Sequence, residues 1–408
     1  MTATTSTATA VPATVATSAT AGLRSVLARE IRYLRHEPWD LALLMWFPAA
    51  SLLLLLWMFS NGIASGLPIA VVDEDHSSAS RELIRRMAAT RGLAIAAQAP
   101  SLEAAQPLVR SGAVYGVVHI PAHWERDRLR HTPQPVVLYD NAQFSLAAGT
   151  IGGDVRAAVG SMALDNAVAS EARFGGGLSQ AALRVASVQA DLRTLFNPSL
   201  SYEAYFGGML LPVVLHLFCV IAAVSALGRE FRNRSVDAWL QSAGGSLTLA
   251  LLGKLAPLSV VYLLFAMATV VTFAGWRGWP AAGSLGLWMV AITVLMMVSI
   301  AIAILIVGLT INLRTALSLT GIYVATGLAF SGFSYPRAAM GATAQWWGGL
   351  LPYTHYLPVQ QGQWLGAAPA SVWAQGMAPL LLFIAVPLLI GLPLLGRAVR
   401  QPARWGGR

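Results

Sequence analysis

Long apolar runs without a single charge are the feature that most constrains how this chain folds. The first run, roughly Leu41–Phe59, reads LALLMWFPAASLLLLLWMF and contains no Asp, Glu, Lys or Arg. An Arg at the centre of a membrane helix costs about 2.5–3.5 kcal/mol, whereas a Leu gains only about 0.3–0.6 kcal/mol. An uncharged run of this length therefore predicts a helix that crosses a lipid bilayer.

Five further runs of the same kind follow the first. They lie at about 205–227, 255–276, 284–308, 316–332 and 374–396. The whole chain is 56% hydrophobic and only 11% charged, whereas an ordinary soluble domain is about 25% charged. We predict one transmembrane helix within residues 38–60 and five more within residues 204–396.

Residues 61–203 separate the first two runs and predict a folded domain outside the membrane. Their first half alternates short apolar segments with polar ones, which is typical of an α/β layer. We expect strands near Pro68–Val72, Leu93–Ala97, Val114–Ile120 and Val136–Tyr139, and helices near Ser80–Ala89, Glu103–Arg110 and His123–Arg130. The Ala-rich part from about 144 to 195 predicts further helices. The expected fold is an all-α polytopic membrane protein with six transmembrane helices and an inserted α/β extracytoplasmic domain.

Basic residues favour one orientation in the membrane. The net charge is +9, and Lys254 is the only lysine. Short segments rich in Lys and Arg stay in the cytoplasm, whereas long loops cross regardless of charge. The Arg-rich segments 22–37 and 397–408 therefore predict cytoplasmic ends, with 61–203 on the other side of the membrane. Residues 1–21, rich in Thr and Ala, lack the features of a signal peptide and predict a disordered cytoplasmic tail.

Residues 22–37 predict an amphipathic helix that lies in the membrane interface. Its apolar face consists of Leu23, Val26, Leu27, Ile31 and Leu34, and its basic residues are Arg24, Arg29, Arg32 and Arg35. Such a helix directs its arginines toward lipid phosphates. A solvated helix before the first span is the alternative.

Residues 228–254 form the main charged interruption between two apolar runs, and they read GREFRNRSVDAWLQSAGGSLTLALLGK. We expect a cytoplasmic loop here that contacts a soluble ATPase. Anchoring of the loop to lipid headgroups is the alternative. By contrast, residues 331–373 are rich in Trp, Gly and Pro, and their short broken segments predict an external re-entrant or interfacial structure. The tryptophans expected at the membrane boundary are Trp346, Trp347, Trp364 and Trp373.

The chain shows no sequence signature of its own energy source. Gly253-Lys254 is preceded by Thr248 at the position of the first glycine of a phosphate-binding loop, and Leu255 follows it. Within the predicted spans, His216 is the one ionisable side chain, and we interpret it as a packing residue. Cys219 is the only cysteine, so an intrachain disulfide is impossible.

Catalytic and metal-binding interpretations are weak. His119, His123 and His131 lie near each other in the sequence, but Pro121 interrupts helical spacing and no cysteine assists. The acidic run at residues 73–75 is typical of a turn after a strand. We predict no catalytic residues, no metal site and no nucleic-acid partner.

Taken together, several segments resemble the ABC-2 type permease family, in the subgroup with a large external domain. They are RSVLAREIRYLRHEP, LPIAVVDEDHSSASRELIRRM, NPSLSYEAYFGGMLLP, GREF followed by LLGKLAP, and SGFSYP followed by WWGGLLPYTHYL. The resemblance covers roughly residues 22–400. One departure is that Arg234-Ser235 and Ser242-Ala243 stand where relatives commonly have Gly-Thr and Thr-Pro.

The resemblance implies a non-catalytic permease subunit of an ATP-driven multidrug-type exporter. ATP and Mg would be bound by a separate ATPase, and this chain would bind no cofactor. The implied partners are that ATPase, a second permease copy or sister permease, membrane lipid, and a periplasmic adaptor with an outer-membrane channel. The residues implied in coupling to the ATPase are Arg229, Glu230, Arg232, Arg234, Asp237, Gly253 and Lys254.

Two other functions remain as alternatives. An ion-coupled secondary transporter would be expected to have internal repeats and ionisable groups inside its spans. A membrane-anchored sensor or assembly factor would act through its external domain. The uncharged spans argue against an ion-coupled transporter and suggest an apolar or amphipathic cargo. A neighbouring gene for an ATP-binding subunit would favour the exporter over both alternatives.

Overall fold

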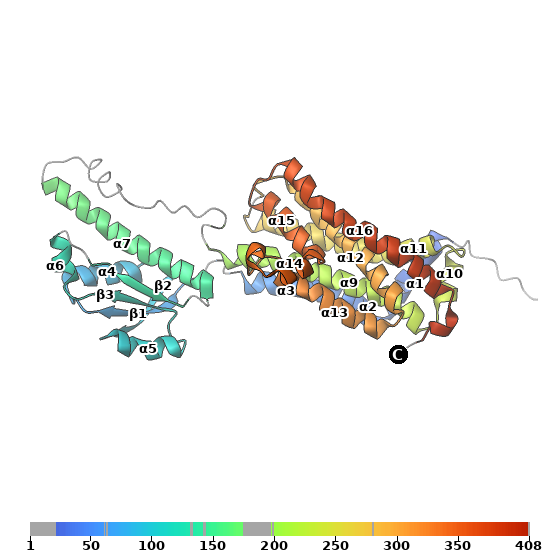
Figure 1. Cartoon of the computed structure of the whole chain (residues 1–408), viewed down its shortest axis with the longest axis horizontal. Helices are drawn as coiled ribbons and strands as arrows, with labels where there is room; N and C mark the ends of the chain where they lie inside the picture. The colour runs from blue at the N-terminus through green and yellow to red at the C-terminus, as the bar shows by residue number, and fades with distance from the viewer. Residues whose placement is uncertain are drawn as a thin grey trace, which may run out of the picture. The chain divides into compact units, whose positions relative to one another are not determined.

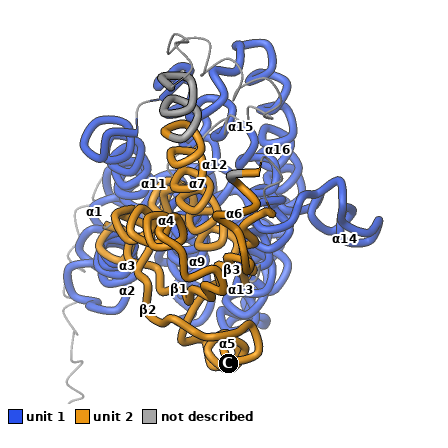
Figure 2. The backbone as a smooth tube through the Cα atoms, turned by 90° about the vertical axis from the view of Figure 1, so that its left-hand side faces the viewer, with its two compact units in different colours: residues 1–55, 208–408 blue, residues 56–207 orange. Residues whose placement is uncertain are grey.

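The computed structural model describes residues 22–60, 62, 64–130, 134–141, 144–173, 197, 200–279 and 281–406. These residues form two compact units (Figure 2). The helical unit contains residues 1–55 and 208–408, and the sheet unit contains residues 56–207. The predicted N-terminal tail and the predicted helices after residue 173 lie outside the described residues.

Helices precede and follow the four-stranded sheet in the sequence (Figure 1). The N-terminal ones are α1 (Leu23–His36), α2 (Pro38–Leu41), η1 (Ala42–Trp46) and α3 (Phe47–Met58). After the sheet unit come η3 (Glu203–Gly207), α9 (Gly208–Arg232), α10 (Val236–Ser242), α11 (Leu247–Val271), η4 (Thr272–Trp276), α12 (Leu285–Thr310) and α13 (Leu313–Phe330). The last are η5 (Arg337–Ala339), α14 (Ala342–Gly349), α15 (Pro352–Trp364), α16 (Ala370–Val399) and η6 (Pro402–Arg404).

Six helical segments among the described residues are long and apolar enough to cross a membrane. They are Pro38–Met58, Glu203–Arg232, Leu247–Trp276, Leu285–Thr310, Leu313–Phe330 and Ala370–Val399. The described residues thus contain as many candidate spans as predicted. The second and third segments are longer than predicted, because α9 continues through Arg232 and α11 begins at Leu247. The predicted loop 228–254 is consequently mostly helical, with α10 between two short turns.

The helix α12 is at the centre of the helical unit and packs against α9, α11, α15 and α16. It is apolar on all sides, as expected for a helix surrounded by protein or lipid. Figure 1 shows α16 running beside α12. A Cβ on Gly391 of α16 would lie 2.8 Å from the Cα of Leu305. Small residues allow membrane helices to approach this closely.

A proline in α9 frees a backbone carbonyl to which a side chain of α15 donates a hydrogen bond. Pro212 has no N–H, so the carbonyl of Gly208 loses its ordinary partner within the helix. The side-chain amide of Gln360 donates to that carbonyl, and the Tyr353 hydroxyl donates to the carbonyl of Met209. The buried backbone groups near the proline are thus paired by side chains from α15.

Residues 331–373, predicted to form a re-entrant or interfacial structure, contain α14 and α15. These helices have 8 and 13 residues and are too short to cross a bilayer. Trp346 is 66% exposed, but Trp364 is buried and stacks on Trp288 with 5.5 Å between ring centroids. The Trp364 ring is therefore not exposed to lipid, and the prediction that it lies at the membrane boundary stays a prediction. Its ring instead fills space between α15 and α12.

The sheet unit contains four strands and the helices packed on them. The strands are β1 (Leu67–Asp73), β2 (Leu93–Ala99), β3 (Gly116–Ile120) and β4 (Val137–Asp140). The helices are α4 (Ser78–Ala88), α5 (Leu102–Arg110), α6 (Trp124–Leu129) and α7 (Ser145–Arg173). The strand order is β2-β1-β3-β4, with β1 parallel to both neighbours and β4 antiparallel to β3. All four predicted strands and the three predicted helices of its first half are present, within a few residues at their ends.

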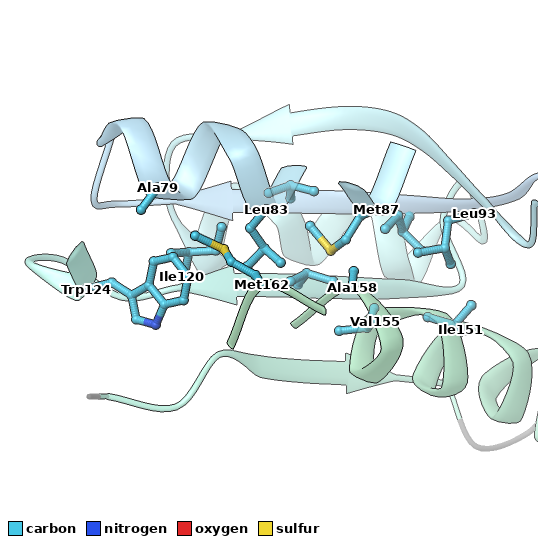
Figure 3. Close-up of a cluster of buried hydrophobic side chains, with 13 residues drawn as sticks. Ala79, Leu83, Met87, Leu93, Ile120, Trp124, Ile151, Val155, Ala158 and Met162 are labelled. Atoms are coloured by element: carbon cyan, nitrogen blue, oxygen red, sulfur yellow. The ribbon is translucent and has the colours of Figure 1, made fainter. Parts of the chain in front are cut away.

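Strand β1 is buried on both faces, as is typical of a central parallel strand. Ile69 and Val71 pack with Leu83 of α4 and Val155 of α7 on one face (Figure 3). Ala70 and Val72 pack toward α5 on the other face. This arrangement explains why the sequence of β1 is continuously apolar rather than alternating.

The acidic run after β1 forms a turn, as predicted. One oxygen of the Asp73 carboxylate accepts hydrogen bonds from the backbone N–H groups of Asp75 and His76, each at 3.1 Å. The other oxygen accepts from the Ser80 hydroxyl at 2.7 Å. Side-chain acceptors of this kind stabilise turns at strand ends.

Candidate functional site: a buried charge network

Six charged side chains from four helices meet inside the helical unit. We call them the charge network: Arg29, Glu30, Asp40, Arg229, Glu230 and Lys254. They come from α1, α2, α9 and α11. Three are acids and three are bases, so the network has no formal net charge. Neutrality matters here because an unpaired charge in an apolar environment is strongly unfavourable.

Lys254 joins the two most buried acids of the network. Its ammonium nitrogen lies 2.9 Å from an oxygen of Glu30 and 2.6 Å from an oxygen of Glu230. The Lys254 side chain is 0% exposed. The ammonium also lies 5.7 Å from the ring centroid of Trp239 in α10, which is close enough for a cation–π interaction. Lys254 therefore links α11 to α1, α9 and α10 through one group.

Arg229 links α9 to α1 and α2. Its guanidinium pairs with Glu30 and with Asp40, the latter at 3.0 Å. The guanidinium carbon lies 4.0 Å above the ring of Tyr33. Burial, the main cause, raises the pKa of the Tyr33 hydroxyl to about 12. Arg229 thus contacts an aromatic face and two carboxylates at once, which its planar guanidinium suits.

Arg29 and Glu230 form a bidentate pair between α1 and the end of α9. The two nitrogen–oxygen distances are 2.8 and 2.9 Å. Burial alone would lower the pKa of Arg29, but the hydrogen bond and the charge of Glu230, with that of Glu30, raise it. The Ser235 hydroxyl donates to the same Glu230 carboxylate. Paired Arg–carboxylate geometry of this kind fixes orientation as well as attraction.

Close backbone contact holds α1 against α11. A Cβ on Gly253 would lie 2.7 Å from Cβ of Val26, so only glycine permits this approach. At the start of α1, the Gly22 N–H donates to the carbonyl of Ser242 at 3.0 Å, and the Ser25 hydroxyl donates to the same carbonyl. The α1 helix is therefore bound to the connection between α10 and α11 as well as to α11 itself.

These contacts correct part of the interfacial-helix prediction. Val26 is buried against protein, and Arg29 pairs with Glu230 rather than pointing to lipid phosphates. Leu23 and Ile31 remain exposed. So do the other predicted interfacial arginines, which are Arg24, Arg32 and Arg35. One side of α1 packs on the protein. The other side is exposed and carries both apolar and basic residues.

The structure divides the predicted coupling residues into two groups. Arg229, Glu230 and Lys254 are each at most 3% exposed. Their charged atoms already pair inside the protein and are not exposed for direct contact with an ATPase, so their predicted role in coupling stays a prediction. Gly253 acts through helix packing rather than docking.

The other three predicted coupling residues, Arg232, Arg234 and Asp237, are exposed at the corner between α9 and α10. Arg234 has a φ of 55°, which lets the chain turn sharply from one helix to the next. The C-terminal segment covers part of this corner, since the Gly406 N–H donates to the Phe231 carbonyl at 2.9 Å. Trp405 anchors that segment by burying its ring. We call the exposed surface of Arg232, Arg234 and Asp237 the corner surface.

A small cavity adjoins the charge network. It has a volume of about 20 Å³, and its lining includes Glu30, Asp40, Arg229 and Lys254 together with apolar side chains such as Leu43. That volume is enough for about one water molecule, and the lining offers the polar partners that a water needs.

Sequence reasoning missed Glu30 and Asp40, and both had a local signal. Glu30 is four residues after Val26 and so lies on the apolar face of α1, where a charge is unexpected unless it is paired. Asp40 is the last charge before an uncharged span. Neither signal identifies the partner, because the partners are about two hundred positions away in the sequence.

His216 is the buried histidine of α9, and its Nδ1 lies 2.7 Å from the Ser299 hydroxyl of α12. This contact agrees with its interpretation as a hydrogen-bonded packing residue. The ring joins the two most buried spans.

A comparison with protein families gives one match over most of the chain. The model of a family described as ABC-2 family transporter protein matches residues 38–392. A search of curated proteins found no match.

Proposed function

The chain belongs to the ABC-2 family of transporter proteins, and on this premise we propose that it is the permease of an ABC exporter. As a multi-pass membrane protein of this family, it is a membrane component of an ABC transporter. The proposal adds a direction and a cargo class: it moves an apolar or amphipathic compound outward across a bacterial inner membrane. Energy comes from an ATPase on a separate chain, which binds ATP and Mg.

One observation carries the coupling proposal: the corner surface begins at the end of α9, which ion pairs connect to α1 and α11 in the helical unit. Arg232 is the last residue of α9, two positions after Glu230 and three after Arg229 in the chain. A push on the corner surface therefore reaches α1 and α11 through ion pairs rather than through a flexible loop. ATP-driven movement of a partner docked there would favour one of two helix arrangements, because the partner would contact the two arrangements differently.

The orientation supports the same proposal. The corner surface, the exposed arginines of α1 and the C-terminal segment with Arg400 and Arg404 make one end of the helical unit basic. Short basic segments stay in the cytoplasm, so both chain ends face the ATPase compartment. The sheet unit then lies in the periplasm, where a periplasmic adaptor and an outer-membrane channel are the proposed partners.

The cargo class follows from the spans. Outside the charge network, the described spans present mostly apolar side chains, and His216 is buried in a packing contact. A pathway of this kind suits a drug-like or lipid-like compound rather than a small ion. The pathway is proposed to form between two permeases, either two copies of this chain or this chain with a sister permease.

A co-purification experiment tests the coupling proposal. The full chain is expressed together with a candidate ATP-binding subunit, and the complex is isolated in mild detergent. The Arg232→Glu/Asp237→Arg variant is expected to insert normally but to lose most of the bound ATPase. The matched control is Arg126→Glu/Asp127→Arg, which reverses a partly exposed pair in the sheet unit. Equal ATPase recovery by both variants would refute docking at the corner surface.

A transport assay tests the direction. Inside-out vesicles that contain both subunits are mixed with a lipophilic fluorescent bisbenzimide dye, and its movement is followed after ATP addition. Dye accumulation in the vesicles supports outward transport in the cell. ATP-dependent dye release from preloaded vesicles would instead show an importer.

A further inference from the structure

The C-terminal segment is attached to the helical unit at two points, and we call its residues 402–406 the clamp. The Trp405 ring is only 5% exposed, and its indole N–H donates to the carbonyl of Ala398 in α16 at 2.9 Å. The N–H of the next residue, Gly406, donates to the carbonyl of Phe231 in α9, also at 2.9 Å. The clamp therefore joins the ends of two spans that are far apart in the sequence.

The two spans that the clamp joins have different neighbours. The helix α9 packs mainly on α11, α12 and α13, whereas α16 packs mainly on α12 and α15. The corner surface begins at Arg232, the last residue of α9. Because the clamp binds both to α16 and to Phe231 in the last turn of α9, the corner surface is supported by α16 as well as by α9.

The clamp also contacts Arg234, a residue of the corner surface with a strained backbone. Arg234 has a φ of 55°, in the left-handed region that residues with a side chain disfavour. Its N–H donates to the Phe231 carbonyl at 3.2 Å, so this carbonyl accepts from both Arg234 and Gly406. A strained residue keeps its conformation only where its surroundings hold it. The clamp is part of those surroundings, since it shares an acceptor with Arg234.

The contact between the clamp and the Arg234 side chain requires a glycine. A Cβ on Gly406 would lie 2.6 Å from Nε of Arg234 and 3.2 Å from one of its terminal nitrogens. The guanidinium therefore lies directly against the Gly406 backbone, without space for a methyl group. Gly406 also has a φ of 82°, which favours glycine. The backbone of the clamp thus limits the positions that the Arg234 guanidinium can take.

The charge of Arg234 is available to a partner. Its side chain is exposed. The buried bases Arg229 and Lys254 pair with acids of the charge network, whereas no ion pair among the described residues includes Arg234. A guanidinium presents its N–H donors in one fixed plane, so its orientation decides how well it binds a carboxylate.

We propose that Trp405 and Gly406 are positioning residues for the docking of the ATPase. Trp405 fixes the clamp to α16, and Gly406 then holds the Arg234 guanidinium in the orientation that pairs with a carboxylate of the ATPase. The inference rests on the proposed docking at the corner surface, and it adds the backbone contact that orients one cation of that surface. Paired Arg–carboxylate contacts depend strongly on such orientation.

Hydrogen exchange on the permease alone tests whether the clamp holds the corner. The full-length protein in lipid nanodiscs is compared with Gly406→Ala, and the backbone N–H groups of residues 233–237 are expected to exchange about tenfold faster in the variant. Gly278→Ala is the matched control. Gly278 has a φ of 73°, but an added Cβ there meets nothing within 4 Å. The control therefore carries similar backbone strain without a displaced neighbour.

Binding of a candidate ATP-binding subunit tests the positioning role. The purified subunit is titrated against the permease in nanodiscs. Gly406→Ala and Arg234→Gln are each expected to weaken binding about tenfold, the effect of losing one charge-assisted pair. The double variant is expected to bind no more weakly than Arg234→Gln alone, because Gly406 acts through Arg234. The elution volume and circular dichroism of each variant show that it remains folded.

The results that would overturn the proposal differ from those that would refute docking itself. If the effects of Gly406→Ala and Arg234→Gln multiply, Gly406 supports the fold without orienting Arg234, and the positioning role is refuted. Binding by Gly406→Ala as tight as by Gly278→Ala, or equal exchange of residues 233–237 in both, would refute it as well. A subunit that failed to bind even the unchanged permease would instead refute the docking proposal, and the positioning role with it.

Discussion

Two groups of charges within residues 229–254 have opposite positions in the fold. Arg229, Glu230 and Lys254 are buried and paired, whereas Arg232 and Asp237 are exposed. In the sequence they form one polar stretch between two apolar runs. The difference arises because α9 and α11 continue into the stretch and turn part of it toward α1. A cluster of charges in a sequence therefore indicates where two membrane helices end. It does not show which of those charges are exposed to a partner.

The two groups also have different relations to stability. Removing one member of a buried pair leaves the other unpaired, which is far more costly than losing a surface contact. The buried group is expected to determine whether the helices stay together, and the exposed group to determine what binds. The variants below test this separation, from the largest expected effect on stability to the smallest.

Glu30→Gln is expected to have the largest effect, about 3–5 kcal/mol of destabilisation, because Arg229 and Lys254 both lose a buried counter-charge. Unfolding is followed by denaturant titration in mixed micelles. Glu37→Gln is the control, since Glu37 is exposed near the end of the same helix. If the two variants were equally stable, the network would not hold α1 in place.

A second variant refines this prediction by restoring neutrality. In Glu30→Gln/Lys254→Met, Arg229 keeps Asp40 and Glu230 keeps Arg29. The double variant is expected to be more stable than the sum of the single changes by about 1–3 kcal/mol. Combining Glu30→Gln with Asp237→Asn provides the comparison, for which the same unfolding measurement is expected to be additive.

Gly253→Ala tests the helix contact without changing any charge. Its new Cβ would meet Val26 at 2.7 Å, so we expect about 1–3 kcal/mol of destabilisation from overpacking. In Gly321→Ala of α13 the added methyl meets nothing within 4 Å. That control is expected to be neutral or slightly stabilising in the same titration, as for Gly to Ala in other helices. A harmless Gly253→Ala would mean that α1 does not pack closely on α11.

Arg232→Ala/Asp237→Ala is expected to have the smallest effect on stability, within about 0.5 kcal/mol, because both side chains are exposed. ATPase binding is measured on the same preparation and is expected to fall. Glu230→Ala gives the contrasting variant, with lower stability before any loss of binding. A large stability loss in the exposed pair would erase the distinction between the two groups.

Much of the fold was predictable because its signals are local. A span is recognised from the summed hydropathy of about twenty neighbouring residues, and all six were found in this way. The strands of the sheet unit were equally accessible, since β1 is a short apolar run ending in Asp73. The ends of α9 and α11 were less accessible, because charged residues were assumed to end a membrane helix. In the fold those charges are paired, so the helices continue through them.

The candidate site was only partly predictable, because its residues are distant from one another in the sequence. Arg229, Glu230 and Lys254 were found from their charge, but Glu30 and Asp40 were not, and three residues assigned to docking proved to be buried.

The amino-acid sequence alone predicted six candidate membrane spans, an inserted region of strands and helices, and a resemblance to the ABC-2 family. Each depends on the order and composition of neighbouring residues. Only the tertiary structure decided that Arg29 meets Glu230, 201 positions later in the chain. The same holds for the strand order β2-β1-β3-β4. Pairing across such separations depends on how helices and strands pack, and packing is a property of the assembled fold rather than of any one segment.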